Sequence, residues 1–314
     1  MKLLITRCLP EKVVTAASTR FEVTYRDDPT SLNPADLRAA LRDFDAVLPT
    51  LGDLFRADVF TDVPQPRTKI LANFGVGYNH IDVPAARAAG LAVTNTPGAV
   101  TDATADIAMT LILMSARRAS EGERLLRSGK WTGWHPTQLL GTHVSGKTVG
   151  IIGMGRIGQA IARRCHHGFG MTVIFHNRSD LSPDLPATQV TLPEALQADF
   201  VVLAVPASPA THHLINRETL AQMRPTAHLI NISRGDVVDE AALIHALQTN
   251  RIAGAGLDVY EHEPHIPAAL TALNNVTLLP HLGTAALEVR EAMGLMAVAN
   301  LIAFLDGQPL PNPV

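Results

Sequence analysis

Three residues of types that perform acid–base chemistry follow three successive apolar segments in the second half of the chain. Arg234 comes after HLINIS, Glu263 lies beyond LDVY, and His281 comes after VTLLP. If these segments are parallel strands of one sheet, their carboxyl ends lie at one edge, which is where open α/β sheets bind ligands. We therefore expect an arginine, a carboxylate and an imidazole to gather in one site.

These three side chains suit the reduction of a 2-oxo acid. Arg234 can bind a carboxylate through two parallel hydrogen bonds and polarise the neighbouring carbonyl group. His281 can donate a proton to the carbonyl oxygen as a general acid. Glu263, hydrogen-bonded to the imidazole, would fix the ring and favour its protonated form. The hydride itself would come from a nicotinamide cofactor.

A binding site for such a cofactor is predicted by the segment TVGIIGMGRIGQAIARR. An apolar strand precedes its GxGxxG pattern and a helical pattern follows it, which is the setting that a dinucleotide requires. Gly153 permits a tight turn, Gly155 lets the backbone approach the pyrophosphate, and Gly158 lets helix and strand pack closely. The other loop residues expected at the cofactor are Met154, Arg156 and Ile157. For Arg156, a phosphate contact and a solvated position are both open.

The segment FHNRSD indicates which dinucleotide the site prefers. An NAD site usually has an acid here that accepts hydrogen bonds from the adenine ribose, whereas this chain has Asn177. Asn177 brings no charge that would repel a 2′-phosphate, and Arg178 and Ser179 can donate to one. We therefore expect NADP(H) to be preferred. If Arg178 is an ordinary surface arginine, NAD(H) binds as well.

The elements that must position these residues form a series of strands and helices after Gly146. Six strands with helical crossovers are typical of a doubly wound Rossmann domain. The segment DLSPDLPATQ within this series is interpreted as a Pro-rich surface loop. The expected strands are residues 147–153, 171–176, 199–206, 228–233, 252–260 and 276–280.

The first third of the chain also alternates apolar strands with helical patterns, which predicts a parallel sheet covered on both faces. An apolar helix, about residues 102–118, joins the two parts, and a last helix, about residues 285–305, is expected to return to the first part. The predicted fold class is thus α/β, with two doubly wound parallel-sheet domains and a cleft between them. The flavodoxin-like substrate-binding domain comprises residues 1–98 and 286–314, and the dinucleotide-binding Rossmann domain comprises residues 99–285.

Two loops of the first domain are candidates for the substrate site. In NFGVGYNHID, a glycine turn presents the N–H groups of Val76 and Gly77, which can hold a carboxylate as a small nest. A simple turn is the alternative interpretation. The segment LPTLGD, with Leu51, is the second candidate wall of the cleft.

Composition excludes several function classes. The formal net charge of −3 gives no electrostatic support for a nucleic-acid or anionic-membrane partner. The longest apolar run, IAMTLILMSA, is too short to span a membrane, and the N-terminus lacks a signal-peptide pattern, so we expect a cytoplasmic protein. The two cysteines, Cys8 and Cys165, have no spacing typical of a disulfide framework or a zinc site, and no metal is expected.

Several ordered motifs now identify a resemblance that covers essentially the whole chain. They are GVGYNHID, VTNTPGAVTDATAD, GKTVGIIGMGRIGQAIARR, NISRGDVVDE, GAGLDVYEHEP and LLPHLGTA. The chain resembles the D-isomer-specific 2-hydroxyacid dehydrogenases, and within them the glyoxylate/hydroxypyruvate reductases. The resemblance implies a homodimer and a catalytic set of Arg234, Glu263 and His281.

The resemblance also implies further site residues. Asp258 would bind the carboxamide of the nicotinamide, together with other cofactor-lining residues, which are Thr104, Val205, Pro206 and Gly283. Ile232 and Ser233, in NISRGD, are expected at the cofactor too. The segment WTGWHPTQLLGTHVSGKTVG looks like the family's dimerisation segment, and Trp134 matches a tryptophan that reaches the partner's substrate pocket. From the residues alone, Trp131 and Trp134 form an aromatic surface patch that is an interface candidate.

The leading hypothesis is an NADPH-dependent reductase of small 2-oxo acids such as glyoxylate and hydroxypyruvate. The presence of Glu263 favours proton transfer to a hydroxy acid over formate oxidation, because relatives that oxidise formate lack this glutamate. A larger substrate such as 2-ketogluconate is an alternative. A different alternative is a non-catalytic dinucleotide-sensing protein, although the family's corepressors have long flanking extensions and this chain has almost none.

Overall fold

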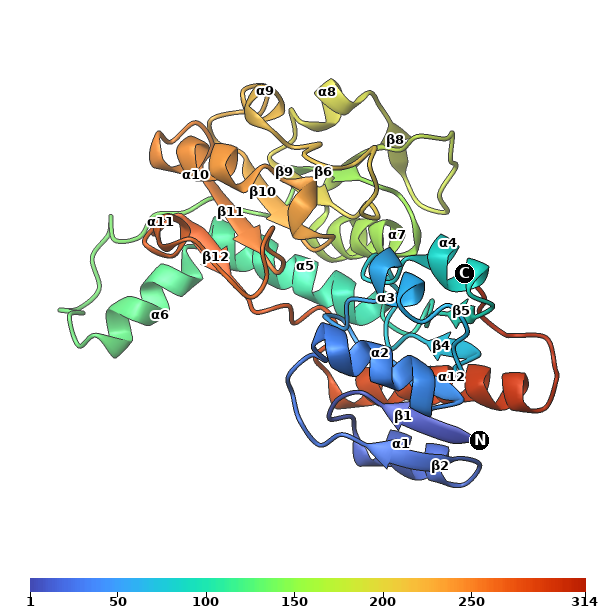
Figure 1. Cartoon of the computed structure of the whole chain (residues 1–314). Coiled ribbons are helices and arrows are strands. Elements are labelled where there is room, and N and C mark those ends of the chain that lie inside the picture. The colour runs from blue at the N-terminus through green and yellow to red at the C-terminus, as the bar shows by residue number, and fades with distance from the viewer. The chain divides into compact units, whose positions relative to one another are not determined.

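The computed structural model describes residues 1–314 as two compact α/β units, shown in Figure 1. The first unit comprises Met1–Val100 and Thr284–Val314, and the second comprises Thr101–Gly283. Both units contain a parallel sheet covered by helices, so the predicted α/β fold class with two parallel sheets is confirmed.

The sheet of the first unit has the strand order β2-β1-β3-β4-β5, and all neighbours pair in parallel. This is the flavodoxin-like order. Its central strands are apolar and buried along their length, because helices cover both faces of the sheet. The strands are β1 (Lys2–Ile5), β2 (Glu22–Tyr25), β3 (Ala46–Leu48), β4 (Ile70–Ala72) and β5 (Ala92–Thr94).

The helices of the first unit show a side-chain cap and a close helix–helix contact. Asn33 caps the second of them by accepting hydrogen bonds from the N–H groups of Ala35 and Asp36. The last helix packs on the first where Gly294 meets Val13, since no Cβ would fit there. These helices are α1 (Glu11–Ser18), α2 (Pro34–Asp43), α3 (Ala57–Thr61), α4 (Val83–Ala88) and α12 (Leu287–Leu305).

The sheet of the second unit has seven parallel strands in the order β12-β11-β10-β9-β6-β7-β8. The chain runs outward from β6 to β8, returns to β9 beside β6, and then continues in the opposite direction. The reversal makes the ends of β6 and β9 a topological switch point, where such sheets bind ligands. The strands are β6 (Thr148–Ile152), β7 (Thr172–His176), β8 (Ala187–Gln189), β9 (Phe200–Leu203), β10 (His228–Asn231), β11 (Gly254–Leu257) and β12 (Val276–Leu278).

The helices of the second unit include a long apolar one, α5 (Thr101–Ala116), which is buried against β10, β11 and α7. Not one of the chain's helices has the length and apolar character needed to cross a membrane. The remaining helices are α6 (Ala119–Arg127), α7 (Arg156–Arg163), α8 (Leu192–Ala195), α9 (Arg217–Leu220), α10 (Glu240–Gln248) and α11 (Ala268–Thr271), with a π-helical turn at Arg164–Gly168 and a 3-10 turn at Gly235–Val237.

Two details of the sequence interpretation are corrected by the structure. The segment interpreted as a Pro-rich loop ends in β8, which pairs with β7. This edge strand is short and only partly buried, so its apolar pattern is weak. The joining helix also ends earlier than expected, at Ala116. Arg118 then adopts a left-handed conformation with φ of 51° and separates α5 from α6.

A buried histidine ties three segments of the second unit together. Ring atoms of His228, at the start of β10, lie 2.8 Å from the Ser115 hydroxyl and 3.3 Å from the Thr142 hydroxyl. The ring also stacks on Phe200. Burial lowers the pKa of His228 from 6.5 to about 4, so the folded protein holds this imidazole in its neutral form.

We expect this histidine to make the fold sensitive to acid. Because protonation favours the unfolded chain, its contribution is complete above pH 6.5 and is lost as the pH falls towards about 4. The shift corresponds to about 3 kcal/mol of unfolding free energy. In His228→Gln, which keeps hydrogen-bonding groups but does not titrate, urea unfolding followed by circular dichroism should depend less on pH over this range.

The matched control is His245→Gln, which removes an exposed histidine from α10 of the same unit. Its unfolding free energy should follow that of the wild type at every pH. If His228→Gln and the wild type lose stability in parallel between pH 6.5 and pH 4, burial of His228 is not the cause of the acid sensitivity.

Candidate functional site

The loops at the carboxyl edge of the second sheet carry almost every polar residue that the sequence singled out. All seven strands are parallel, so their carboxyl ends lie at the same edge. The glycine loop follows β6, FHNRSD continues from β7, and Val205 and Pro206 follow β9. Ile232–Arg234 follow β10, Asp258 and Glu263 follow β11, and His281–Gly283 follow β12.

The glycine loop has the geometry of a dinucleotide site. Gly153 turns the chain with φ of 99°, and a Cβ there would lie 2.7 Å from the carbonyl oxygen of Ala204. Gly158, in the first turn of α7, is in contact with the carbonyl oxygen of Gly153 and also has no space for a Cβ. Gly155 differs, because a Cβ added there would meet nothing within 4 Å. A pyrophosphate can therefore approach the backbone at Gly155, beside the N-terminus of α7.

The other predicted contacts of this loop differ in accessibility. Met154 is buried, Ile157 is half-buried, and Arg156 is exposed at the first position of α7. A side chain at this position can reach a phosphate or extend into solvent, so the role of Arg156 stays a prediction.

Asn177 links the loop after β7 to the glycine loop. Its Oδ1 accepts a hydrogen bond from the N–H of Met154 at 3.3 Å, and its Nδ2 donates to the carbonyl oxygen of Ser179 at 2.9 Å. The amide thus has a structural task that sequence reasoning did not identify. Arg178 is exposed and has no acidic partner in the protein, so its guanidinium is available to an anion.

The loop after β10 holds Arg234 in an extended conformation, with φ of −144° and ψ of 152°. Asn231, the last residue of β10, donates to the carbonyl oxygen of Arg234 at 2.9 Å and accepts from the N–H of Ser233 at 3.0 Å. The Nη1 of Arg234 donates to the carbonyl oxygen of Ser233 at 2.7 Å. The end of the strand therefore holds the backbone at Arg234 and accepts one hydrogen bond from its guanidinium.

Glu263 and His281, from neighbouring strand ends, form a hydrogen-bonded pair. The Nδ1 of His281 lies 2.9 Å from Oε2 of Glu263. The other carboxylate oxygen, Oε1, accepts from the backbone N–H of Tyr260 at 3.0 Å. His281 itself has a left-handed backbone with φ of 55°, and its N–H donates to the carbonyl oxygen of Asp258 at 2.9 Å. With Nδ1 occupied by Glu263, Nε2 is the ring atom that can transfer a proton to a ligand.

The surroundings of Glu263 and Arg234 shift the pKa of each of these side chains. Burial alone would raise the pKa of Glu263, but the hydrogen bond and charge of His281 and the N–H of Tyr260 outweigh it, so this pKa lies below its ordinary value. Burial lowers the pKa of Arg234, while the charges of Glu263 and Asp236 act in the opposite direction. The guanidinium still remains charged at neutral pH. Glu263 is therefore ionised beside the imidazole of His281.

Asp258 fixes the loop that follows β12. Its Oδ1 accepts from the N–H of Leu282 at 2.6 Å, and its Oδ2 accepts from the N–H of Gly283 at 2.8 Å. The hydroxyl of Thr104 donates to the carbonyl oxygen of Gly283 at 3.2 Å. These predicted cofactor residues are thus brought together. The expected bond from Asp258 to a nicotinamide carboxamide stays a prediction, since both of its oxygens already accept backbone hydrogen bonds.

Two positioning residues were missed by sequence reasoning. Tyr260 donates its hydroxyl hydrogen bond to the carbonyl oxygen of Leu279 at 2.9 Å, two positions before His281. Gly235 has no space for a Cβ because the backbone of Tyr260 lies against it. The signal that points to Tyr260 is a phenol at the end of a buried strand, whose hydroxyl requires a partner. The contact at Gly235 joins residues distant in sequence, so no local pattern indicates it.

The predicted substrate loops belong to the first unit. Val76 and Gly77 follow β4 and are partly exposed, and their N–H groups have no acceptor within the protein. Leu51 follows β3, and its side chain is exposed. An isolated bridge between Thr50 and Phe74 places the two loops side by side.

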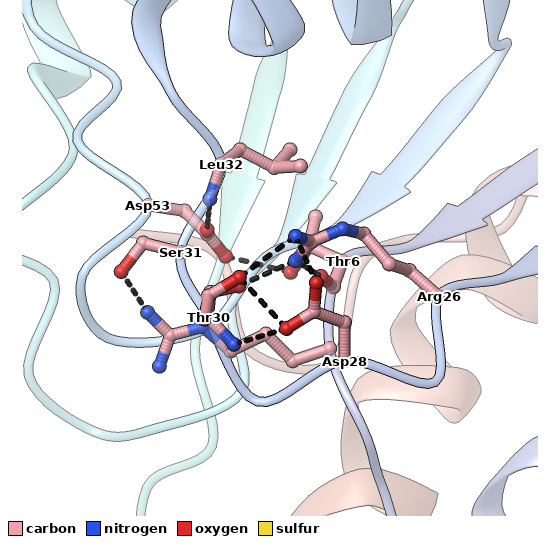
Figure 2. A network of polar contacts seen from close by, with 8 residues as sticks. Thr6, Arg26, Asp28, Thr30, Ser31, Leu32 and Asp53 are labelled. Carbon is pink, nitrogen blue, oxygen red and sulfur yellow. Dashed lines mark hydrogen bonds and ion pairs between the residues drawn. The ribbon is translucent and has the colours of Figure 1, made fainter.

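The loop of Leu51 is held by the buried carboxylate of Asp53, which Figure 2 shows. Its Oδ2 accepts from the Thr6 hydroxyl at 2.6 Å and from the N–H of Thr50 at 2.8 Å, and its Oδ1 accepts from the N–H of Leu32 at 3.0 Å. The neighbouring pair of Arg26 and Asp28, also labelled in Figure 2, stabilises the adjacent turn.

A segment of the second unit exposes large apolar side chains. Helix α6 buries none of its residues, and Figure 1 shows it and the segment that follows extending away from the sheet of its own unit. Trp134 is 79% exposed, and the other exposed apolar residues of this segment are Leu126, Trp131 and Leu140. Such a surface is typical of a contact with another chain.

Comparison with known proteins gives consistent matches. Residues 109–283 match the model of the family described as D-isomer specific 2-hydroxyacid dehydrogenase, NAD binding domain. The chain is 45% identical to a glyoxylate reductase of Thermococcus onnurineus and 44% identical to one of Pyrococcus furiosus, and both alignments cover 100% of this chain and 95% of the relative.

A solved structure with the same fold is the NADPH-dependent glyoxylate/hydroxypyruvate reductase of Sinorhizobium meliloti in complex with NADP and malonate. The two chains are 36% identical with a TM-score of 0.88, and the match covers 100% of this chain and 96% of that one. The similarity therefore includes both units and the loops that carry the candidate site.

Two alanine substitutions in the glycine loop should separate ligand binding from folding. Gly155→Ala adds a methyl group that no protein atom opposes, so its thermal midpoint without ligand should match the wild type. The same methyl group lies where the pyrophosphate must approach, so dinucleotide affinity, measured by fluorescence titration, should fall by about tenfold or more.

Gly158→Ala provides the contrast, because its methyl group meets the carbonyl oxygen of Gly153. Its thermal midpoint should fall even without ligand. Unchanged dinucleotide affinity in Gly155→Ala would show that the cofactor does not use this loop.

Proposed function

Since the chain belongs to the D-isomer-specific 2-hydroxyacid dehydrogenase family, we propose that it is an NADPH-preferring reductase of glyoxylate and hydroxypyruvate. The products are glycolate and D-glycerate. The family and its glyoxylate reductase members already make the chain an oxidoreductase of small 2-oxo acids that binds a nicotinamide dinucleotide. The proposal adds the cofactor preference, the preferred substrates and the roles of individual residues.

One observation carries the proposal, which is the hydrogen bond between His281 Nδ1 and Glu263 at 2.9 Å. It leaves Nε2 as the proton donor and holds a carboxylate against the ring, which is the arrangement that general acid catalysis requires. Arg234 follows the neighbouring strand β10, and its charge acts on Glu263. A guanidinium, an imidazole and an ionised carboxylate therefore share one sheet edge.

The residues act together in the reduction. When bound, the reduced nicotinamide supplies the hydride that forms the new C–H bond at the substrate's C2. His281 transfers its Nε2 proton to the carbonyl oxygen as negative charge develops there. Arg234 stabilises that oxygen and binds the substrate's carboxylate. Glu263 holds the imidazole in place and is available to stabilise it when it takes up the next proton.

The N–H groups of Val76 and Gly77 are proposed as a further partner of the substrate carboxylate. A nest of two backbone N–H groups suits one carboxylate. Leu51, from the adjoining loop, is proposed to contact the remainder of the substrate. A small apolar contact of this kind favours compact 2-oxo acids such as glyoxylate over a long polyhydroxylated acid such as 2-ketogluconate.

The loop after β7 supports the preference for NADPH. Asn177 brings no negative charge to the loop, and its amide is engaged with Met154 and Ser179. Arg178 is exposed and unpaired by any acid, which suits a 2′-phosphate. NADH lacks this phosphate and would bind more weakly, without being excluded.

The exposed segment around Trp134 is proposed to form a homodimer interface. Its apolar residues belong to a projecting part of one unit, where a second copy can bury them. In that arrangement Trp134 would contribute to the partner's substrate site, as the resemblance to the family implies.

The central test is turnover of glyoxylate with NADPH, followed by the absorbance of the reduced nicotinamide. We expect the wild type to be active and His281→Ala to lose about a thousandfold in kcat, because removal of a general acid costs about two to four orders of magnitude. NADPH affinity of the variant, measured by fluorescence titration, should stay close to that of the wild type.

The control is His265→Ala, a change of the same type at an exposed position beyond β11. It should leave kcat unchanged. Wild-type protein that binds NADPH but reduces no small 2-oxo acid would contradict the enzymatic proposal and favour a dinucleotide-sensing protein. Full turnover in His281→Ala would remove this residue from proton transfer.

Arg178→Ala tests cofactor selection. Because the guanidinium is proposed to meet only the 2′-phosphate, KM for NADPH should rise by about tenfold, while KM for NADH should change less than about twofold. Steady-state kinetics with each cofactor at saturating glyoxylate measure both values.

Arg217→Ala is the matched control, since Arg217 is an exposed arginine on α9 of the same unit. Neither KM should respond to it. Equal effects of Arg178→Ala on the two cofactors would mean that Arg178 does not recognise the 2′-phosphate.

A further inference from the structure

In the loop after β4, the carbonyl oxygens of Gly75, Val76 and Gly77 all accept hydrogen bonds from other groups of the protein. The side chain of Asn73 donates to the carbonyl oxygens of Gly75 and Gly77, both at 3.0 Å. The N–H of Thr96 also donates to Gly75, at 3.1 Å. One buried amide group thus holds two carbonyl groups of a loop of the first unit.

Asn95 binds the third carbonyl oxygen of this loop. Its Nδ2 donates to the carbonyl oxygen of Val76 at 2.9 Å. Asn95 is buried and follows β5, the neighbour of β4 in the sheet. The carbonyl oxygens of residues 75–77 are therefore all directed towards the protein interior.

The orientation of Asn73 is fixed by His80. Two carbonyl oxygens can accept only from the NH2 of the Asn73 amide, so its oxygen must point the other way. There it lies 3.0 Å from Nε2 of His80, which is also buried. The ring nitrogen consequently donates, and the amide cannot flip without losing every one of these bonds.

The direction of the carbonyl groups determines the direction of the N–H groups. In a planar trans peptide, the C=O of one residue and the N–H of the next point opposite ways. Holding the carbonyl oxygen of Gly75 therefore turns the N–H of Val76 outward, and holding that of Val76 turns out the N–H of Gly77. These are the two N–H groups that have no acceptor within the protein.

The adjacent loop after β3 shows the opposite arrangement. There the carboxylate of Asp53 accepts hydrogen bonds from the N–H of Thr50 at 2.8 Å and from the N–H of Leu32, which Figure 2 shows. The N–H groups that donate to Asp53 are thereby not free to bind an anion. Asn73 and Asn95 donate to carbonyl groups instead, so the N–H groups of Val76 and Gly77 stay available to an anion.

We infer that Asn73 is the positioning residue of the substrate's carboxylate site, and that His80 and Asn95 support it. The inference rests on the proposed function and adds the residues that create the N–H nest before substrate arrives. Preorganised donors of this kind bind a carboxylate without paying for reorientation at the moment of binding. None of the three side chains needs to touch the substrate.

The test is Asn73→Asp in the full-length chain, assayed with glyoxylate and NADPH. The carboxylate can still accept from His80 but can no longer donate to Gly75 or Gly77, and it adds a negative charge behind the nest. KM for glyoxylate should rise by about tenfold to a hundredfold. KM for NADPH should change less than about twofold, since the dinucleotide does not use this loop.

The pH dependence of the variant gives a second signature. A protonated carboxyl group is neutral and donates one hydrogen bond, so KM of Asn73→Asp for glyoxylate should recover partly as the pH is lowered. The wild-type asparagine does not titrate and should show no such recovery. A merely destabilised loop would not recover in acid.

Asn33→Asp is the matched control, because it makes the same chemical change at the N-cap of α2 in the same unit. The cap only accepts hydrogen bonds, so an aspartate replaces it and the kinetics should be unchanged. If Asn73→Asp is folded by circular dichroism and its KM for glyoxylate equals that of the wild type, the inference is overturned.

Two further measurements keep the inference separate from the proposed function. If Asn73→Asp does not fold, Asn95→Asp is assayed in its place, because Asn95→Asp removes only the bond to Val76. An unchanged KM for glyoxylate in Asn95→Asp would equally overturn the inference. If the wild type reduces no 2-oxo acid, the proposed function fails, and calorimetric titration with oxalate decides the inference alone. Weaker oxalate binding by Asn73→Asp would support it, and equal binding would contradict it.

Discussion

The parallel arrangement of strands is the constraint on which the rest of the second unit depends. Because every strand ends at the same edge, Arg234, Glu263 and His281 are brought together although they follow three different strands. The same edge exposes backbone groups that no neighbouring strand pairs, and these groups need other partners. Asn231 and Asp258 provide them, so the side chains that complete the strand ends also position the reactive ones.

Electrostatics follows from this geometry. Glu263 stays ionised because an imidazole, a backbone N–H and a guanidinium offset its partial burial. Its carboxylate in turn holds the ring of His281 through a hydrogen bond of 2.9 Å. In the first unit, the side chains that hold the loop are neutral. Asn73 and Asn95 orient its peptide groups by donating hydrogen bonds to their carbonyl oxygens. In both units, hydrogen bonds within the protein therefore orient the candidate ligand-binding groups.

Several elements were predictable because their signals are local. Gly153, Gly155 and Gly158 stand between an apolar strand and a helix, and the structure places each in the environment that this spacing requires. The buried strands β9 and β10 lie within the apolar runs that predict strands at residues 199–206 and 228–233. β8 was missed because it is short and has little apolar periodicity. The cofactor, catalytic and substrate roles assigned to individual residues remain predictions for experiment.

The sequence by itself determined the fold class, the glycine loop and the identities of the three catalytic candidates, because strand hydrophobicity and turn chemistry are properties of neighbouring residues. Only the tertiary structure decided how these residues are held. Three contacts depend on the orientation of single amides or backbone groups. They are the hydrogen bond of Asn177 to the glycine loop, the contact of Gly235 with Tyr260, and the hydrogen bonds of Asn73 to the loop after β4. Such orientations depend on groups that come into contact only in the folded chain, so no local sequence pattern predicts them.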